Sequence, residues 1–146
     1  MPEYPHVVNE DGTITIFVGK LGVPSKIDGR IYNASEEVID KFTKSNIGKI
    51  VGTFGHPDVS NLVNVKDYFK RLEEKDPFKS VGILVDADLK VDEPYLVIEP
   101  SKRLRKMVDD NVPFVMGIRA IVTAHSMEHG NRVNVEKIIS YDVVTK

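Results

Sequence analysis

Apolar and polar residues alternate with a period of two in several short stretches of the chain, a pattern typical of half-buried β-strands. Residues 13–19 show this alternation clearly. The other predicted strands cover residues 50–54, 81–89, 95–98, 114–124 and 133–144. Residues that favour turns lie between neighbouring strands, at Asp92–Pro94 and His125–Arg132 for example, so we interpret these connections as loops.

Three segments between these strands predict helices. Asn33 with Glu36 forms a capping-box pattern ahead of a narrow apolar stripe, and this helix is expected to end near Gly48. Asn64 can cap a second helix, and Ser101 begins a third. The order β-α-β-α-β-β-α-β-β predicts an α+β fold: a mixed or antiparallel sheet, or a small barrel, flanked by about three helices. No linker or repeat interrupts residues 1–146, so we expect a single domain.

Composition narrows the classes of function. The chain has 146 residues, 41% hydrophobic and 29% charged, as expected for a globular protein with one core. The formal charge is −2, and basic and acidic residues are interleaved, so nucleic acid is not an expected partner. The absence of cysteine excludes a disulfide scaffold, a thiol nucleophile and thiolate zinc sites. No apolar run approaches the ~20 residues that span a bilayer, and we identify no secretory signal, so no membrane partner is expected.

Two histidine-containing segments are candidates for chemistry. His56 lies in a Gly-His-Pro turn at the end of a predicted strand, where a rigid backbone can hold a general base; the alternative is a surface-loop histidine without a role. Residues 125–129 spell H-x-x-E-H, the inverted zincin pattern. That pattern binds zinc when its histidines lie on a helix, whereas here Gly130-Asn131 follows at once and predicts a hairpin loop. We therefore expect no metal site.

The predicted strand 114–124 contains a charged residue and a glycine in an apolar run. Burial of Arg119 is costly unless its charge is paired, so this residue either lies on the solvent face or has a buried partner. Gly117 suggests a bulge or a close approach of another segment. Asp142, in the last predicted strand, can pair with Arg119, orient a histidine, or be an exposed strand residue.

In their order along the chain, these features resemble the prohead core protease family of tailed phages, which is related in fold to the herpesvirus assemblins. Gly29–Tyr32 is similar to the arginine–x–tyrosine motif of that family, and Gly52–Pro57 to its G-x-x-x-H-P motif. Residues 81–113 contain segments similar to those that lead to the nucleophile, and Tyr141–Val144 resembles the aspartate-containing strand that closes the domain. The resemblance extends over nearly the whole chain and implies an assemblin-like fold.

The resemblance also implies residue roles. It places the catalytic histidine at His56 and an arginine of the nucleophile motif at Arg119. Asp142 is the best candidate for the third catalytic partner, with Glu128 or Asp58 as alternatives. No cofactor and no metal are implied.

The nucleophile is where this chain departs from the family. The family has serine–x–arginine followed by glycine or alanine, and alignment on Arg119 places Gly117 at the serine position; an ungapped count from the preceding Val-Pro step places Met116 there. Neither residue has a hydroxyl, and loss of the nucleophile costs a serine protease around a million-fold in turnover. Ser126 and Ser140 are the remaining hydroxyls to consider, although neither stands at the motif position.

Three hypotheses follow. In the first, the chain is a prohead-protease-like protein that is inactive and serves as a structural or assembly component of a phage particle. Its partners would be capsid or scaffold proteins or copies of itself, in the virion or in the host cytoplasm during assembly. In the second, it is an active or artificially inactivated serine endopeptidase that cleaves capsid and scaffold proteins during head maturation. In the third, it is an unrelated interaction module, in which His56, Gly117 and Asp142 lie far apart.

Overall fold

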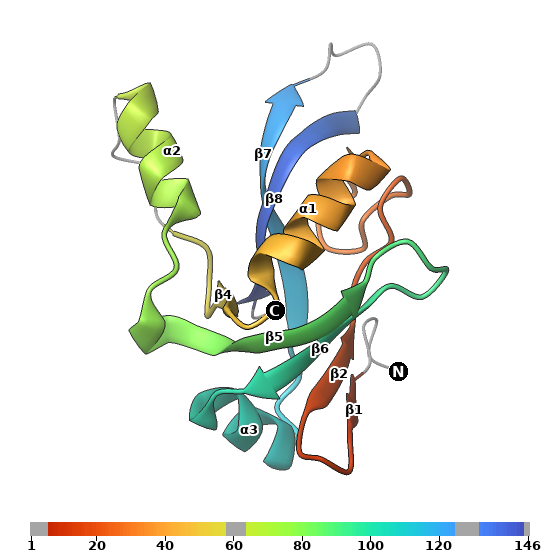
Figure 1. Ribbon diagram of the computed structural model, residues 1–146, viewed down its shortest axis with the longest axis vertical. Helices are drawn as coiled ribbons and strands as arrows, with labels where there is room; N and C mark the ends of the chain where they lie inside the picture. Colours follow the sequence, from red (N-terminus) through yellow and green to blue (C-terminus); the bar gives the residue numbers. More distant parts are fainter. Residues whose placement is uncertain (1–5, 58–63, 125–131, 145–146) are drawn as a thin grey trace.

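The computed structural model describes residues 6–57, 64–124 and 132–144, and within these ranges the chain is α+β with its strands in two sheets (Figure 1). The elements in chain order are β1 (His6–Val8), β2 (Ile14–Phe17), β3 (Ile31–Asn33), α1 (Glu36–Asn46), β4 (Ile50–Thr53), α2 (Val65–Glu73), the 3₁₀ turn η1 (Pro77–Lys79), β5 (Ser80–Asp88), β6 (Tyr95–Pro100), α3 (Lys102–Asp109), β7 (Val115–Ala124) and β8 (Arg132–Val144).

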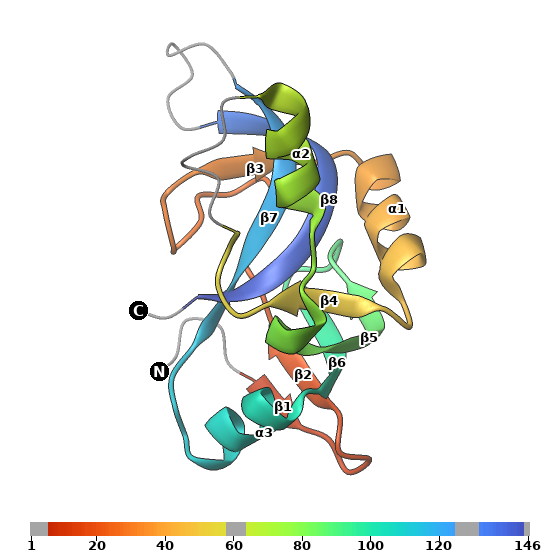
Figure 2. The same ribbon diagram turned by 90° about the vertical axis from the view of Figure 1, so that its left-hand side faces the viewer.

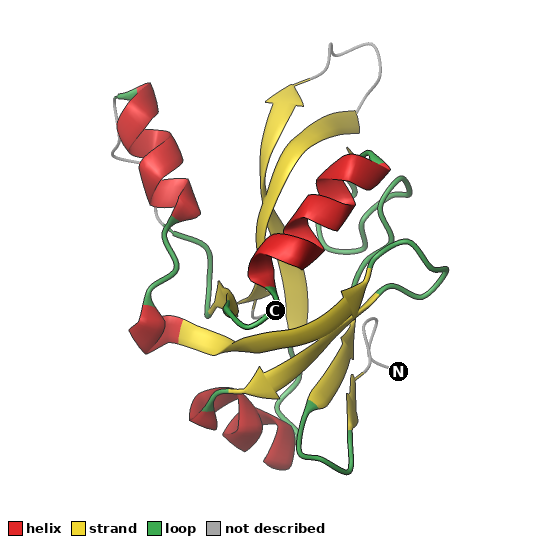
Figure 3. Cartoon of the chain, in the orientation of Figure 1, coloured by secondary structure: helices red, strands yellow, loops and turns green. Residues whose placement is uncertain are grey.

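The larger sheet has five antiparallel strands in the order β1-β2-β6-β5-β4. The smaller sheet has the order β3-β8-β7, with β8 antiparallel to β7 and parallel to β3. The helices lie around the strands (Figure 3). The α+β class is therefore as predicted, and in the described part of the chain the strands form two sheets and no closed barrel.

The core lies where apolar strand positions meet α1. In β2, Ile14 and Ile16 are buried while the residues between and after them are half-buried, as the period-two pattern predicts. Phe42 of α1 contacts Tyr141 of β8, with ring centroids 5.7 Å apart in an edge-to-face arrangement. This contact packs the C-terminal half of β8 against α1.

Side-chain caps begin each helix, although not always at the predicted residue. Asn64 caps α2 by accepting a hydrogen bond from the Lys66 amide, as predicted, and Ser101 caps α3. The cap of α1 is Ser35, whose hydroxyl accepts from the Val38 amide, so the prediction of Asn33 as the cap is wrong. The reason is that Asn33 belongs to β3, whose pairing with β8 takes it out of the helix.

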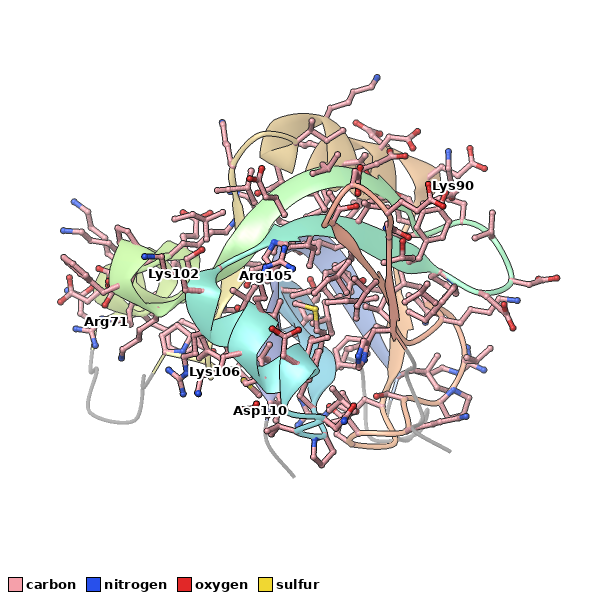
Figure 4. The ribbon with its side chains drawn as sticks, turned by 90° about the horizontal axis from the view of Figure 1, so that it is seen from below. Arg71, Lys90, Lys102, Arg105, Lys106 and Asp110 are labelled. Atoms are coloured by element: carbon pink, nitrogen blue, oxygen red, sulfur yellow. The ribbon has the colours of Figure 1, made fainter. Side chains whose placement is uncertain are left out.

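A junction between the two sheets holds the loop after β4. Phe54 forms a parallel bridge with Val143 of β8, and the Gly55 amide donates to the Val143 carbonyl at 2.8 Å. On its other side, the guanidinium of Arg103 in α3 lies 4.1 Å from the centroid of the Phe54 ring. Figure 4 shows α3 from below, with other basic side chains along it. The loop that carries His56 is thus anchored directly before the histidine.

α2 stands at one side of the molecule, facing β7 (Figures 1 and 2). It is amphipathic, yet none of its residues is buried, and Tyr68 and Phe69 are 39% and 40% exposed. Its attachment to the body is therefore weak in apolar area and depends on polar contacts at its C-terminal end, which Arg119 supplies.

Two short strands, β1 and β3, were not predicted. Each has three residues, too few to display an alternating pattern, and each exists through pairing with a longer neighbour. Among the described helices, none has the length and apolar character required to cross a membrane.

Candidate functional site

Three strand segments that are distant in sequence bring the candidate residues together. His56 follows β4, Gly117 and Arg119 lie on β7, and Asp142 lies on β8. Gly117 is the direct cross-strand partner of Asp142 in the antiparallel register of β7 and β8. The bridge between Phe54 and Val143 of β8 places the His56 loop next to Asp142.

Asp142 is the centre of the arrangement and is fully buried. Its Oδ1 accepts from the Thr53 amide at 2.9 Å and the Ser140 hydroxyl at 2.9 Å, and its Oδ2 lies 2.7 Å from His56 Nδ1. Burial by itself raises the pKa of Asp142, but the hydrogen bonds from His56, Thr53 and Ser140 and the charge of Arg119 hold that pKa below its ordinary value. Asp142 is therefore an ionised carboxylate at neutral pH.

This carboxylate determines how His56 is oriented. An ionised Asp142 can only accept, so His56 donates from Nδ1 and, when neutral, keeps its lone pair on Nε2. The His56 side chain is 45% exposed, in contrast to its partner. This is the geometry of a general base: one ring nitrogen held by a buried carboxylate and the other directed toward a groove.

Gly117 lies directly in front of that second nitrogen. A Cβ atom built at Gly117 would stand 3.6 Å from His56 Nε2, a distance that a serine hydroxyl can close to hydrogen-bond length. Met116 is 1% exposed and packs in the core, so it does not occupy the equivalent place. The alignment on Arg119 is therefore the one that the geometry favours, and position 117 completes the site without supplying a hydroxyl.

Arg119 is buried, with 3% of its surface exposed, so the alternative of a solvent-facing arginine is wrong. Its Nε lies 2.9 Å from Asp142 Oδ2 and 2.7 Å from Ser140 Oγ, and its Nη2 donates to Asp142 Oδ1 at 3.1 Å. A bulge after Arg119 shifts the register with β8, next to this contact. The guanidinium therefore holds the carboxylate in place.

The same guanidinium anchors α2. Its Nη1 donates to the carbonyls of Leu72 and Glu74, at 3.1 and 2.7 Å. These carbonyls belong to the C-terminal end of the helix, where unpaired acceptors and the negative end of the dipole favour a cation. Arg119 therefore links α2 to the His56–Asp142 pair.

Gly52 explains why the G-x-x-x-H-P pattern begins with glycine. A Cβ at Gly52 would lie 1.9 Å from the Tyr141 carbonyl oxygen, which no side chain permits. The close approach of β4 to β8 lets the next residue, Thr53, donate its amide to Asp142. The lack of a side chain at Gly52 thus allows β4 to lie close enough to β8 for the Thr53 amide to bind Asp142.

A groove of about 350 Å³ opens at these residues. It is lined by residues of the segment 25–32, of α2 and of β7. The residues that line it include Ile27, Tyr32, His56, Tyr68, Leu72, Gly117 and Ile118. The Gly29–Tyr32 segment, singled out from the sequence, thus forms part of the same site, where burial and the Asp28 carboxylate raise the pKa of Tyr32 to about 12.

Thr53, Ser140 and Lys75 have roles at the site that are not predicted from the sequence. Ser140 was considered as a nucleophile, but it is fully buried and its hydroxyl donates to Asp142. The signal for this role is its spacing from Asp142: residues two apart on a strand share a face.

Lys75 donates to Asn46 Oδ1 at 2.6 Å and to the Ile50 carbonyl at 3.1 Å. Burial, then the charge of nearby Arg119, lowers the pKa of Lys75 to about 8.

The other candidates fall outside the described residues. These are Asp58, Ser126, Glu128 and the whole H-x-x-E-H segment. Within the described ranges, no cluster of histidine, aspartate and glutamate side chains has the composition of a metal site.

The described residues thus form a buried aspartate, an oriented histidine and a glycine where a nucleophile would stand, all bordering one groove. The close packing of His56, Gly117 and Asp142 is the opposite of what the unrelated-module hypothesis expects. Comparisons with protein-family models, with curated proteins and with solved structures each found no match.

Proposed function

We propose that this chain is a phage prohead-protease-like protein that has lost peptidase activity and acts as a structural or assembly component of the phage particle. The observation that carries the proposal is the position of Gly117: a Cβ atom there would lie 3.6 Å from Nε2 of His56, the histidine whose Nδ1 is bound to Asp142. Together with the motif resemblance, this geometry supports a serine-protease site in which the nucleophile alone is missing.

Inactivity toward peptides follows from the chemistry. Amide hydrolysis by a Ser-His-Asp site needs an attacking oxygen, and glycine offers none. Ser140, the serine nearest to Asp142 in sequence among the described residues, is fully buried and donates to that carboxylate, so it cannot attack a substrate in the groove. Loss of the serine from such a site lowers turnover around a million-fold.

The proposed role in assembly rests on the groove and on the resemblance. A groove that combines apolar residues with the charged Asp28 and Arg30 and that includes Gly117 suits a polypeptide segment. Its partners would be capsid or scaffold proteins, or other copies of the chain, and its location the virion or the host cytoplasm during assembly. The chain would bind such segments without cutting them.

Labelling with a fluorophosphonate probe, read by intact mass, tests the proposal on the parent chain and on Gly117→Ser. We expect the Gly117→Ser variant to gain one probe adduct and the parent to gain none. The matched controls are Gly117→Ala, which adds a side chain without a hydroxyl, and Gly117→Ser combined with His56→Ala, which removes the base. Labelling of the parent, or no labelling of Gly117→Ser when its fold is intact, would contradict the proposal.

The intact His56–Asp142 pair also favours a second candidate: a serine endopeptidase of head maturation whose nucleophile has been replaced artificially by glycine. Such an enzyme would cleave capsid and scaffold proteins. Mass spectrometry of mature particles separates the two candidates. An assembly component remains in the particle at stoichiometric copy number, whereas a maturation protease leaves trimmed capsid proteins and is itself degraded or lost.

A further inference from the structure

We infer that the His56–Asp142 pair activates a water molecule at Gly117, so that the chain slowly hydrolyses activated carboxylic esters although it cannot cleave peptides. The inference rests on the site geometry that also supports the proposed function, and goes beyond it by assigning the glycine form a chemistry of its own. The substrate class is an aryl ester of a small apolar acid.

The geometry creates a place for water next to the base. The space that a side chain at position 117 would fill is called here the Gly117 notch. Three atoms bound it: His56 Nε2 and Ile27 Cδ1, each 3.6 Å from the Cβ position, and Val144 Cγ2 at 3.2 Å. Because glycine has no Cβ, a water oxygen can enter this notch from the groove and occupy the position in front of Nε2. Alanine would fill the notch with a methyl group and exclude it.

The base is prepared for proton transfer. Asp142 is ionised and holds Nδ1, so the Nε2 lone pair faces the Gly117 notch. When water loses its proton to Nε2, the imidazolium that forms is stabilised by the buried carboxylate, as in a hydrolase triad. Arg119 and Ser140 fix that carboxylate from the other side and keep the pair aligned during the transfer.

The reaction balances with water as its one co-reactant. Water oxygen forms a bond to the ester carbonyl carbon while its proton moves to His56 Nε2. The tetrahedral intermediate then collapses, the bond to the aryloxide breaks, and the histidine proton passes to the leaving oxygen. The products are a carboxylic acid and a phenol, and no electrons are transferred. An aryloxide is a stable leaving group, so this ester reaction demands far less of the site than amide cleavage does.

The groove provides the acyl pocket. Ile27, Leu72 and Ile118 line it beside His56, and they suit a short alkyl chain. The groove is also lined by Asp28 and Arg30, but against the three apolar side chains a carboxylate-bearing acyl group would lose hydration. We therefore expect p-nitrophenyl butyrate to be a better substrate than its succinyl-type, carboxylate-bearing counterpart.

The test is the rate of p-nitrophenyl butyrate hydrolysis by the full chain, with the heat-denatured chain as background. We expect a rate above background that falls to background in His56→Ala and in His56→Gln. Gly117→Ala should lose at least ~100-fold, the lower end of the range for general acid–base catalysis. The matched control is His6→Ala, which removes a histidine that stacks on Phe114 and does not line the groove, and it should leave the rate unchanged. A solvent deuterium isotope effect clearly above one is expected for proton transfer from water.

Three results would overturn the inference: no rate above background, an unchanged rate in either His56 variant, or an unchanged rate in Gly117→Ala. A butyryl adduct on His56, detected by peptide mass mapping, would also overturn it, since the histidine would then act as a nucleophile. Failure here is distinguishable from failure of the proposed function. If Gly117→Ser is labelled by the fluorophosphonate but the parent hydrolyses no ester, only the present inference fails; ester hydrolysis without labelling of Gly117→Ser contradicts only the proposed function.

Discussion

Replacement of Arg119 by methionine should destabilise the fold and loosen α2 at the same time. Methionine keeps most of the length and volume of the side chain but removes every donor. The Asp142 carboxylate, which is fully buried, would then lose the cation that lies 2.9 Å from its Oδ2. The carbonyls of Leu72 and Glu74 would lose their donor as well.

The magnitude follows from the charge that remains. Breaking a buried ion pair by removing one partner costs about 3 to 5 kcal/mol, because the other charge stays buried without compensation. His56, Thr53 and Ser140 still donate to Asp142, so we expect about 3 kcal/mol, the lower end of that range. Arg119→Lys retains the charge without the planar fork and should cost less.

Urea denaturation followed by circular dichroism measures the free energy of unfolding, and native-state hydrogen exchange reports on α2 separately. The matched control is Lys41→Met, which removes an exposed cation from α1 and should change stability by no more than about 0.5 kcal/mol. In the double variant Arg119→Met with Asp142→Asn, the loss of unfolding free energy should be smaller than the sum of the losses in the two single variants. A loss below about 1 kcal/mol in Arg119→Met, or unchanged exchange in α2, would refute the reasoning.

Two further predictions concern residues around this site. Gly52→Ala should destabilise the chain by at least ~3 kcal/mol, because the new Cβ would overlap the Tyr141 carbonyl. Gly48→Ala is the control and should cost less, since no atom lies near its Cβ position, although its φ is positive. Equal losses of unfolding free energy in urea denaturation would contradict this. Lys75 has a folded-state pKa of about 8 against an ordinary 10.5, so the folded chain binds fewer protons than the unfolded chain between these values, and stability should rise with pH from 8 to 10.5. Allowing for solvent screening of this half-buried group, the rise relative to Lys75→Met should be about 1 to 2 kcal/mol, and parallel stability curves for the two chains would exclude it.

Much of the fold was predictable because the responsible signals are local. Alternation identified β2, and a capping asparagine identified the start of α2. The start of α1 was misplaced because Asn33 and Ser35 are both good caps, and only pairing of β3 with β8 decides between them. That pairing joins residues about a hundred positions apart and has no local signature.

In the candidate site, too, the residues with local signals were predictable and those that depend on tertiary contacts were not. His56 and Asp142 stood out through residue type and turn chemistry, and the structure places their side chains 2.7 Å apart. The burial of Arg119 could not be decided from the sequence, since period-two alternation allows either face and a bulge changes the register directly after it. Likewise, nothing local indicates that Ser140 is a carboxylate partner, because that role depends on three side chains from two strands.

The most direct test of the central claim is a crystal structure of Gly117→Ser, and specifically the distance between Ser Oγ at position 117 and His56 Nε2. The account predicts a hydrogen bond of about 2.6 to 3.2 Å, with Asp142 still bound to Nδ1, as in an assembled Ser-His-Asp site. A hydroxyl that stands well beyond hydrogen-bond reach of His56 in every rotamer would contradict the assignment of position 117 and, with it, the proposal of a protease-like site that lacks its nucleophile.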